Sequence, residues 1–156
     1  MSSIREQIAG LVVAALSGDA KGPVVKPDAL TVHRERTRPI EQDQLPAILV
    51  YFEDDEPTPL AKQRFQAPLT ERHLNVVLEL RTTPASGVSP DSAIDPLYIW
   101  AMQQIMADER FGGVAMGVTE GPTKWTAKEA DVVLAGAALH LVIHFRTSRK
   151  DPSSAT

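Results

Sequence analysis

The 156-residue chain contains no cysteine, which excludes a disulfide framework, a zinc site built on thiolates and a cysteine nucleophile. Aromatic residues make up only 5% of the chain, and this scarcity disfavours a platform on which nucleic acid bases stack. An excess of basic charge is absent as well, because 16 Lys and Arg residues stand against 20 Asp and Glu residues. Sequence-specific nucleic acid is therefore not an expected partner, since its binding depends on a basic surface.

Long hydrophobic runs are also missing, and no segment approaches the roughly 18 apolar residues of a membrane-spanning helix. The best candidate for a targeting signal is the mostly apolar segment Ile8–Leu16. A secretory signal needs a basic stretch before this segment, but Glu6 cancels the charge of Arg5. We therefore expect a helix of a folded protein there and no membrane partner.

What is present is the composition of one globular domain, with 43% hydrophobic and 23% charged residues. A capping box at Ser3–Glu6 and apolar residues at spacings of three and four predict a first helix over Ile4–Leu16. We expect Gly18 to end this helix in a left-handed conformation. A second helix is predicted to start at Asp95, which precedes a proline, or one turn earlier at Asp91.

Alternating and continuous apolar segments predict the strands. They are Ala29–Arg38, Ala47–Phe52, Arg72–Arg81, Val114–Glu120 and Leu139–Arg146. Gly121 and Pro122 are predicted to form a turn, and Glu53–Thr70 a polar loop that begins where the second strand breaks. The order of elements indicates a single α+β domain over residues 1–148, a mostly antiparallel sheet packed with two main helices. Residues 149–156 are expected to form a disordered tail.

Three arginines alternate in the first predicted strand. In an extended chain Arg34, Arg36 and Arg38 project from one side at intervals of about 6.6 Å. Such a ladder suits a row of carboxylates or phosphates. It equally suits an edge strand whose charges prevent unwanted pairing. Neither interpretation implies catalysis.

Four consecutive acidic residues follow the second predicted strand. Glu53, Asp54, Asp55 and Glu56 offer the oxygen ligands that a hard divalent ion prefers, but not at the spacing of an EF-hand. The favoured interpretation is a solvated acidic turn. We predict no metal site here.

The histidines give no stronger indication of chemistry. On a strand, His140 and His144 lie about 13 Å apart, too far to share one ion, so we expect them on the outer face of a sheet or inside a subunit contact. Phosphate-binding loops and a nucleophile elbow are absent from the sequence. We predict no cofactor and no catalytic residue. A small α/β enzyme that uses His73, His140 or His144 remains the remote alternative.

Several segments, taken in order, have a familiar form. They are HRERTRPI, LPAILVYFEDDE, RHLNVVLELRT, DPLYIWAMQQIMAD, FGGVAMGVTEGPTKW and ALHLVIHFRTS. From about Ile4 to Ser148, this succession resembles the tail terminator family (minor tail protein U-like) of long-tailed bacteriophages and prophages. The similarity lies in the order of elements and in short pieces such as L-P-A-I.

The resemblance implies a structural protein without cofactor or catalysis. It implies a hexameric ring that sits on the completed tail tube, stops the addition of tube subunits and offers a surface for joining the head. The expected partners are further copies of the chain, the tube protein and a head completion or neck protein. The expected location is the tail–head junction of the virion, and the host cytoplasm during assembly. Head–tail joining proteins of similar build are the alternative.

A ring needs one surface that complements a different surface of the neighbouring copy. We therefore expect the arginines at 34, 36 and 38 and the acidic residues Glu53–Glu56 to serve subunit or tube contacts. Complementary charge of this kind mainly sets register and the rate of encounter.

Overall fold

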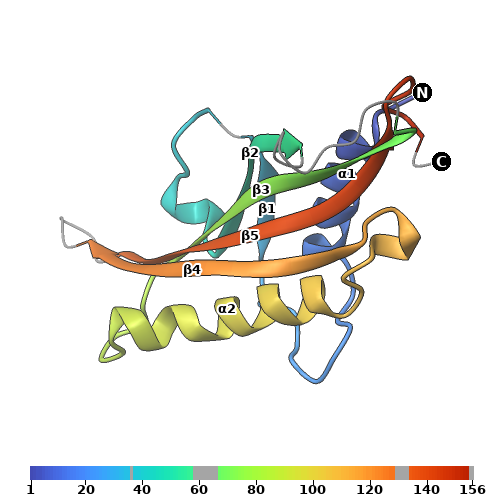
Figure 1. The fold of residues 1–156 in the computed structure, drawn as a ribbon. Helices are drawn as coiled ribbons and strands as arrows, with labels where there is room; N and C mark the ends of the chain where they lie inside the picture. Colours follow the sequence, from blue (N-terminus) through green and yellow to red (C-terminus); the bar gives the residue numbers. More distant parts are fainter. Residues whose placement is uncertain (36, 58–66, 129–133, 155–156) are drawn as a thin grey trace.

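The computed structural model describes residues 1–35, 37–57, 67–128 and 134–154. The described residues form two α-helices, α1 (Ile4–Ser17) and α2 (Pro90–Met106), and one sheet of five strands (Figure 1). The strands are β1 (Thr31–Arg34), β2 (Ala47–Pro57), β3 (Leu69–Thr82), β4 (Gly117–Lys128) and β5 (Leu134–Ser148). Short 3-10 helices span Gln42–Gln44 (η1) and Phe111–Gly113 (η3).

The strands lie in the order β1-β2-β3-β5-β4. Every neighbouring pair is antiparallel except β1 and β2, which are parallel. The two longest strands, β3 and β5, pair along their whole length and form the centre of the sheet. This arrangement confirms the predicted α+β class, with a mostly antiparallel sheet and two main helices.

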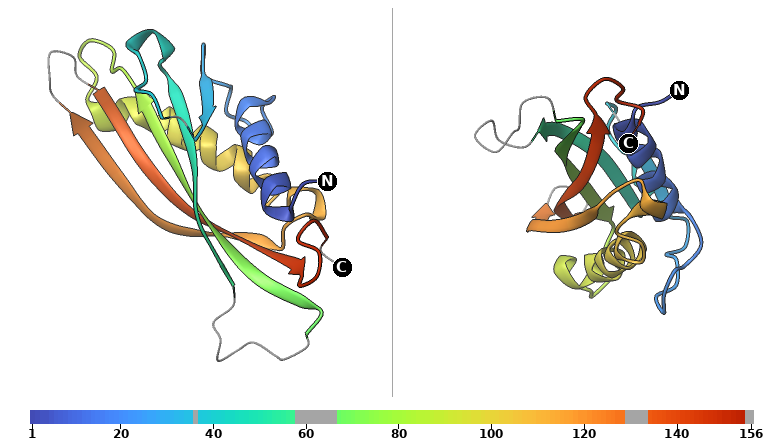
Figure 2. Two further views of the ribbon diagram at one scale, coloured as in Figure 1. Left: turned by 90° about the horizontal axis from the view of Figure 1, so that it is seen from above. Right: turned by 45° about the vertical axis from the view of Figure 1, so that its right-hand side comes forward.

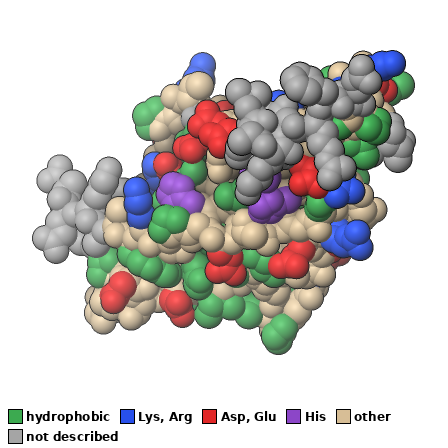
Figure 3. Space-filling model, viewed as in Figure 1, with side chains coloured by type: hydrophobic (Ala, Val, Ile, Leu, Met, Phe, Trp, Pro, Cys, Tyr) green, Lys and Arg blue, Asp and Glu red, His purple; other side chains and the backbone are tan. Residues whose placement is uncertain are grey.

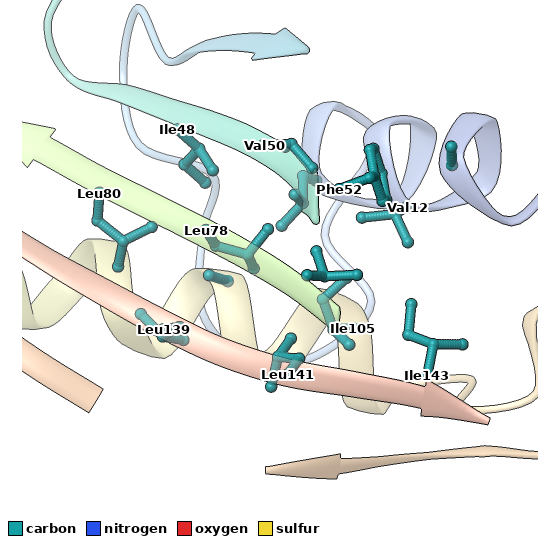
Figure 4. Packing of buried hydrophobic residues seen from close by; sticks show 14 of the residues in the cluster. Val12, Ile48, Val50, Phe52, Leu78, Leu80, Ile105, Leu139, Leu141 and Ile143 are labelled. Carbon is teal, nitrogen blue, oxygen red and sulfur yellow. The ribbon is translucent and has the colours of Figure 1, made fainter. Parts of the chain in front are cut away.

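Both helices pack on the same face of the sheet (Figure 2). Period-two alternation in β3 and β5 turns every second side chain toward them, and Leu78 lies opposite Leu139 in this layer. Figure 4 shows the packing of this layer against the helices. Its larger members from the strands are Ile48, Val50, Phe52, Leu74, Val76, Leu78, Leu80, Leu139, Leu141, Ile143 and Phe145. Each large side chain buried there stabilises the fold by roughly 1.5–3 kcal/mol.

The end of α1 is satisfied by side chains of α2. The buried amide of Gln104 donates to the carbonyls of Ala15 (2.8 Å) and Asp19 (2.9 Å). The indole of Trp100 donates to the carbonyl of Leu16 at 3.1 Å. Gly18 has φ −81°, so the prediction of a left-handed cap was wrong. Donors from a distant helix bind the terminal carbonyls, and no local turn is needed.

The first strand is shorter than predicted. It ends at Arg34 because Glu35 has a positive φ of 48°, a conformation that L-residues rarely adopt. Two bonds to β2 hold Glu35 there: its N–H donates to Val50 O at 2.9 Å, and its carboxylate accepts from Phe52 N–H at 2.8 Å. A strand is therefore present where one was predicted, but the predicted bounds Ala29–Arg38 were wrong. Arg38 does not share the strand of Arg34, and Arg36 lies outside the described residues.

The second strand is longer than predicted, because it continues through the acidic residues to Pro57. A bulge between Phe52 and Asp55 shifts the register, after which Asp55 lies opposite Leu74. Pairing with β3 thus overrides the local preference of the acidic run for a turn. Of the predicted loop Glu53–Thr70, residues 58–66 lie outside the described residues.

Helix α2 starts at Pro90, close to the predicted alternative and before the favoured start, which was wrong. Pro90 is well suited to the first helical position, where its missing N–H needs no partner within the helix. Pro96 lies inside the helix, and its missing N–H costs one hydrogen bond of the helix. The predicted turn at Gly121 and Pro122 was also wrong. Strand β4 passes through both residues with a bulge, and at a sheet edge a proline need not donate to a neighbouring strand.

The two chain ends lie side by side (Figure 1). Composition led us to expect a disordered tail over 149–156, and its described part folds against the start of α1. The N–H of Ile4 donates to the carbonyl of Pro152 at 2.8 Å, and that of Ser148 donates to Ser154 at 2.7 Å. None of the described helices combines the length and apolar character that a bilayer span requires.

Candidate interaction surface

The sheet face that points away from the helices carries mixed side chains, which we call the open face. Its members on the two central strands are Glu71, His73, Asn75, Val77, Glu79, His140, Val142, His144 and Arg146. Histidine, acidic and basic groups share the side of the molecule that Figure 3 shows. Val77 is buried and Val142 is partly exposed, so this face presents mainly its polar and charged side chains.

Two histidines meet at one end of the open face. His73 and His144 are direct neighbours across β3 and β5, with ring centroids 4.7 Å apart in an edge-on arrangement. The Nε2 atom of His144 lies 2.8 Å from the hydroxyl of Thr119 on β4. Burial lowers the pKa of His144 below its ordinary value of 6.5, and the charge of His73 lowers it further. The environment of His144 therefore favours its neutral ring at neutral pH.

His140 lies on the same face but opposite Val77, away from the histidine pair. This placement agrees with the expectation that His140 and His144 lie on the outer face of a strand. Within the part of the chain that the structure describes, no three His, Asp or Glu side chains lie close enough to hold a metal ion.

Ion pairs flank the open face. Arg146 on β5 pairs with Glu71 on β3 at 2.8 Å, and Arg81 pairs with Glu79 at 2.7 Å. All four side chains are about one-third to one-half exposed, so each pair contributes little to stability. Their positions nevertheless fix a pattern of charge on this face, and a protein that bound the face would need complementary charges.

Of the predicted arginines, Arg34 has a partner within the chain. Its guanidinium forms two bonds of 2.8 Å with the carboxylate of Glu6 on α1 and lies 5.3 Å from the ring centre of Phe52. The ion pair lowers the pKa of Glu6 and raises that of Arg34. Arg34 thus connects the first helix to the sheet. Arg38 is exposed in the segment that follows β1.

The predicted acidic residues point in different directions. Glu53 and Asp54 are exposed in the bulge of β2, and Glu56 is exposed opposite His73. Asp55 accepts a 2.8 Å bond from Nε of Arg72, on the side of the sheet that faces α1. The structure therefore does not keep the four carboxylates together as one cluster.

A groove at the end of the sheet was not predicted. It has a volume of about 570 Å³ and is lined by Ser3, Arg5, Asp55, Arg72, Thr147 and Arg149, among others. Its three arginines come from α1, from β3 and from the tail after β5. No short-range pattern in the sequence links residues this far apart, and only the folded chain brings them together.

No protein-family model matches the chain, and no curated protein matches it either.

Proposed function

We propose that this chain is a structural protein that forms a ring, a hexamer, on the end of a phage tail tube. There it stops the addition of tube subunits and offers the surface to which the head attaches. The proposal places the protein at the tail–head junction of the virion. Its partners are its own copies, the tube protein and a neck protein.

The observation that carries the proposal is the one-sided packing of the sheet. Both helices cover one face, while the open face presents partly exposed histidines and ion pairs. In a cyclic assembly each copy contributes two different surfaces to its neighbours. The open face and the charged end of β2, with exposed Glu53 and Asp54, are two such surfaces on different parts of the fold.

The resemblance in the order of segments from Ile4 to Ser148 supports the same function. Of the residues expected at contacts, the exposed ones suit the role best: Arg38, Glu53, Asp54 and Glu56. Arg34 contributes indirectly, because it positions α1 against the sheet.

Electron microscopy of tails assembled with and without the chain tests this function. We expect tubes of defined length, each with a ring at one end, when the protein is present, and overlong tubes when it is omitted. The double charge reversal Glu53→Lys and Asp54→Lys should weaken ring formation at moderate salt. Reversal of exposed Glu109, which follows α2, serves as the matched control.

Purified protein mixed separately with headless tails and with tailless capsids distinguishes the alternative. Binding to capsids alone, with unchanged tube lengths, would contradict capping and indicate a head–tail joining protein.

A further inference from the structure

The groove at the end of the sheet lies where the side of the sheet that packs on the helices stops being apolar. On this side, β3 and β5 carry buried apolar residues as far as Leu74 and Phe145. The next positions of the same alternation line the groove, and they are Arg72 and Thr70 on β3 and Thr147 on β5. The floor of the groove therefore offers N–H and O–H donors in place of apolar side chains.

The start of α1 forms a wall of the groove through Ser3 and Arg5. The hydroxyl oxygen of Ser3 accepts from the N–H of Glu6 at 3.2 Å, so its own O–H stays available to donate. Arg5 forms no ion pair or hydrogen bond with any residue that the structure describes, and the neighbouring carboxylate of Glu6 is bonded to Arg34. The N-terminus of the helix adds a partial positive charge at this wall.

The balance of charge inside the groove is positive, although the whole chain carries a net charge of −4. Asp55 accepts a 2.8 Å bond from Nε of Arg72, and this ion pair leaves the terminal N–H groups of Arg72 as further donors. Arg149 also lines the groove, but it already has an interaction within the chain. The uncompensated charge is therefore that of Arg5.

A buried hydroxyl opens into the groove. Thr147 is only 7% exposed, and its hydroxyl makes no hydrogen bond to any residue that the structure describes. Since no fully buried polar side-chain atom of the described residues lacks a partner, the Thr147 oxygen must open into the groove that it lines. A hydroxyl kept in this position has an O–H ready to donate to an anionic ligand.

We propose that this groove binds a phosphate group. Arg5 pairs with its charge through two N–H donors, and Ser3, Thr147 and the terminal N–H groups of Arg72 donate to its other oxygens. These donors come from the start of α1 and from two strands, which suits the several oxygens of a tetrahedral phosphate better than the two coplanar oxygens of a carboxylate. With a volume of about 570 Å³, the groove also has room for a molecule that carries the phosphate.

Calorimetric titration of the full chain tests the proposal. The probes are inorganic phosphate and adenosine monophosphate, and the controls are acetate and adenosine. We expect both phosphate compounds to bind at least tenfold more tightly than the controls, and added sodium chloride to weaken their binding. Tighter binding of the monophosphate indicates that the group arrives on a larger molecule, and equal affinities indicate the free ion.

Substitutions in the groove give the sharper test. Thr147→Val should weaken phosphate binding roughly tenfold, because a hydrogen bond to a charged group is lost, and Thr147→Ser, which keeps the hydroxyl, should restore it. Arg5→Gln should weaken binding more strongly, because it removes the uncompensated charge. Arg146→Gln is the matched control, since Arg146 precedes Thr147 on β5 but lies on the open face, paired with Glu71.

The phosphate site is overturned if neither phosphate compound binds, if acetate or adenosine binds as tightly, or if Arg146→Gln costs as much affinity as Arg5→Gln. Unchanged binding by Thr147→Val would show that phosphate meets only surface charge and would overturn it as well. Thermal unfolding of every variant verifies that its fold is retained.

This inference does not depend on the proposed ring, because the titration uses the isolated chain. A failed titration would leave tail capping standing, and normal tube lengths without the protein would leave the phosphate site standing.

Discussion

Successive residues of the central strands point to opposite faces of the sheet, and the two faces differ in how deeply their side chains are buried. On β5, Leu139, Leu141, Ile143 and Phe145 are nearly inaccessible to solvent and pack under the helices. The alternate residues His140, Val142 and His144 lie on the open face and stay partly exposed. The difference teaches that the same strand stabilises the fold through one set of positions and stays partly accessible to solvent at the other.

The largest expected effect on this comparison is the loss of stability when a side chain on the face under the helices is truncated. Leu78→Ala should destabilise the protein by about 2–5 kcal/mol, because Leu78 is completely buried and the truncation leaves a cavity. Val142→Ala, on the open face, should cost less than about 1 kcal/mol. Urea unfolding of both variants measures the two values. Similar losses at the two positions would contradict a one-sided core.

A smaller loss is expected from Gln104→Ala, which tests the polar contacts beneath the covered face. The substitution leaves the Ala15 and Asp19 carbonyls and the Lys21 N–H without their side-chain partner. Unmet groups of this kind cost about 1–3 kcal/mol. Thermal unfolding measures the loss, and Gln42→Ala, at an exposed position, should leave stability nearly unchanged.

The smallest expected effect is a pH dependence from the open face. His144 has a lowered pKa in the folded protein, so the unfolded chain binds its proton more readily. Its contribution to stability is therefore complete above the ordinary pKa of 6.5 and is lost as the pH falls through the window below it. Carboxylates whose pKa is lowered, such as Glu6, also lose their contribution to stability as the pH falls. They do so only near and below their ordinary pKa of 4.5.

Urea unfolding of the wild type and of His144→Asn at neutral and mildly acidic pH measures this effect. We expect the variant to lose less stability on acidification than the wild type. His73→Asn should also reduce the loss, because it removes a charge that lowers the pKa of His144. An unchanged pH dependence in both variants would show that the histidine pair is not responsible.

Alternation and helical spacing were sufficient to predict the fold class, because they depend on contacts that repeat every two or three to four residues. Helix α1 and the centre of β3 follow their patterns closely. The ends of elements were less predictable where a distant partner decides them. Glu35 ends β1 because it bonds β2, and the acidic residues stay in β2 because β3 pairs with them. Local composition contains no information about such a partner.

The sequence by itself determined the α+β class, the two main helices and the outward placement of His140 and His144, since side-chain periodicity fixes which residues share a face. Only the tertiary structure decided that Arg34 binds Glu6, that Asp55 separates from its acidic neighbours and that three distant arginines meet in one groove. The physical reason is that charges interact through space. Their partners depend on where the folded chain brings them, whereas the period of a strand or helix is set by its own backbone.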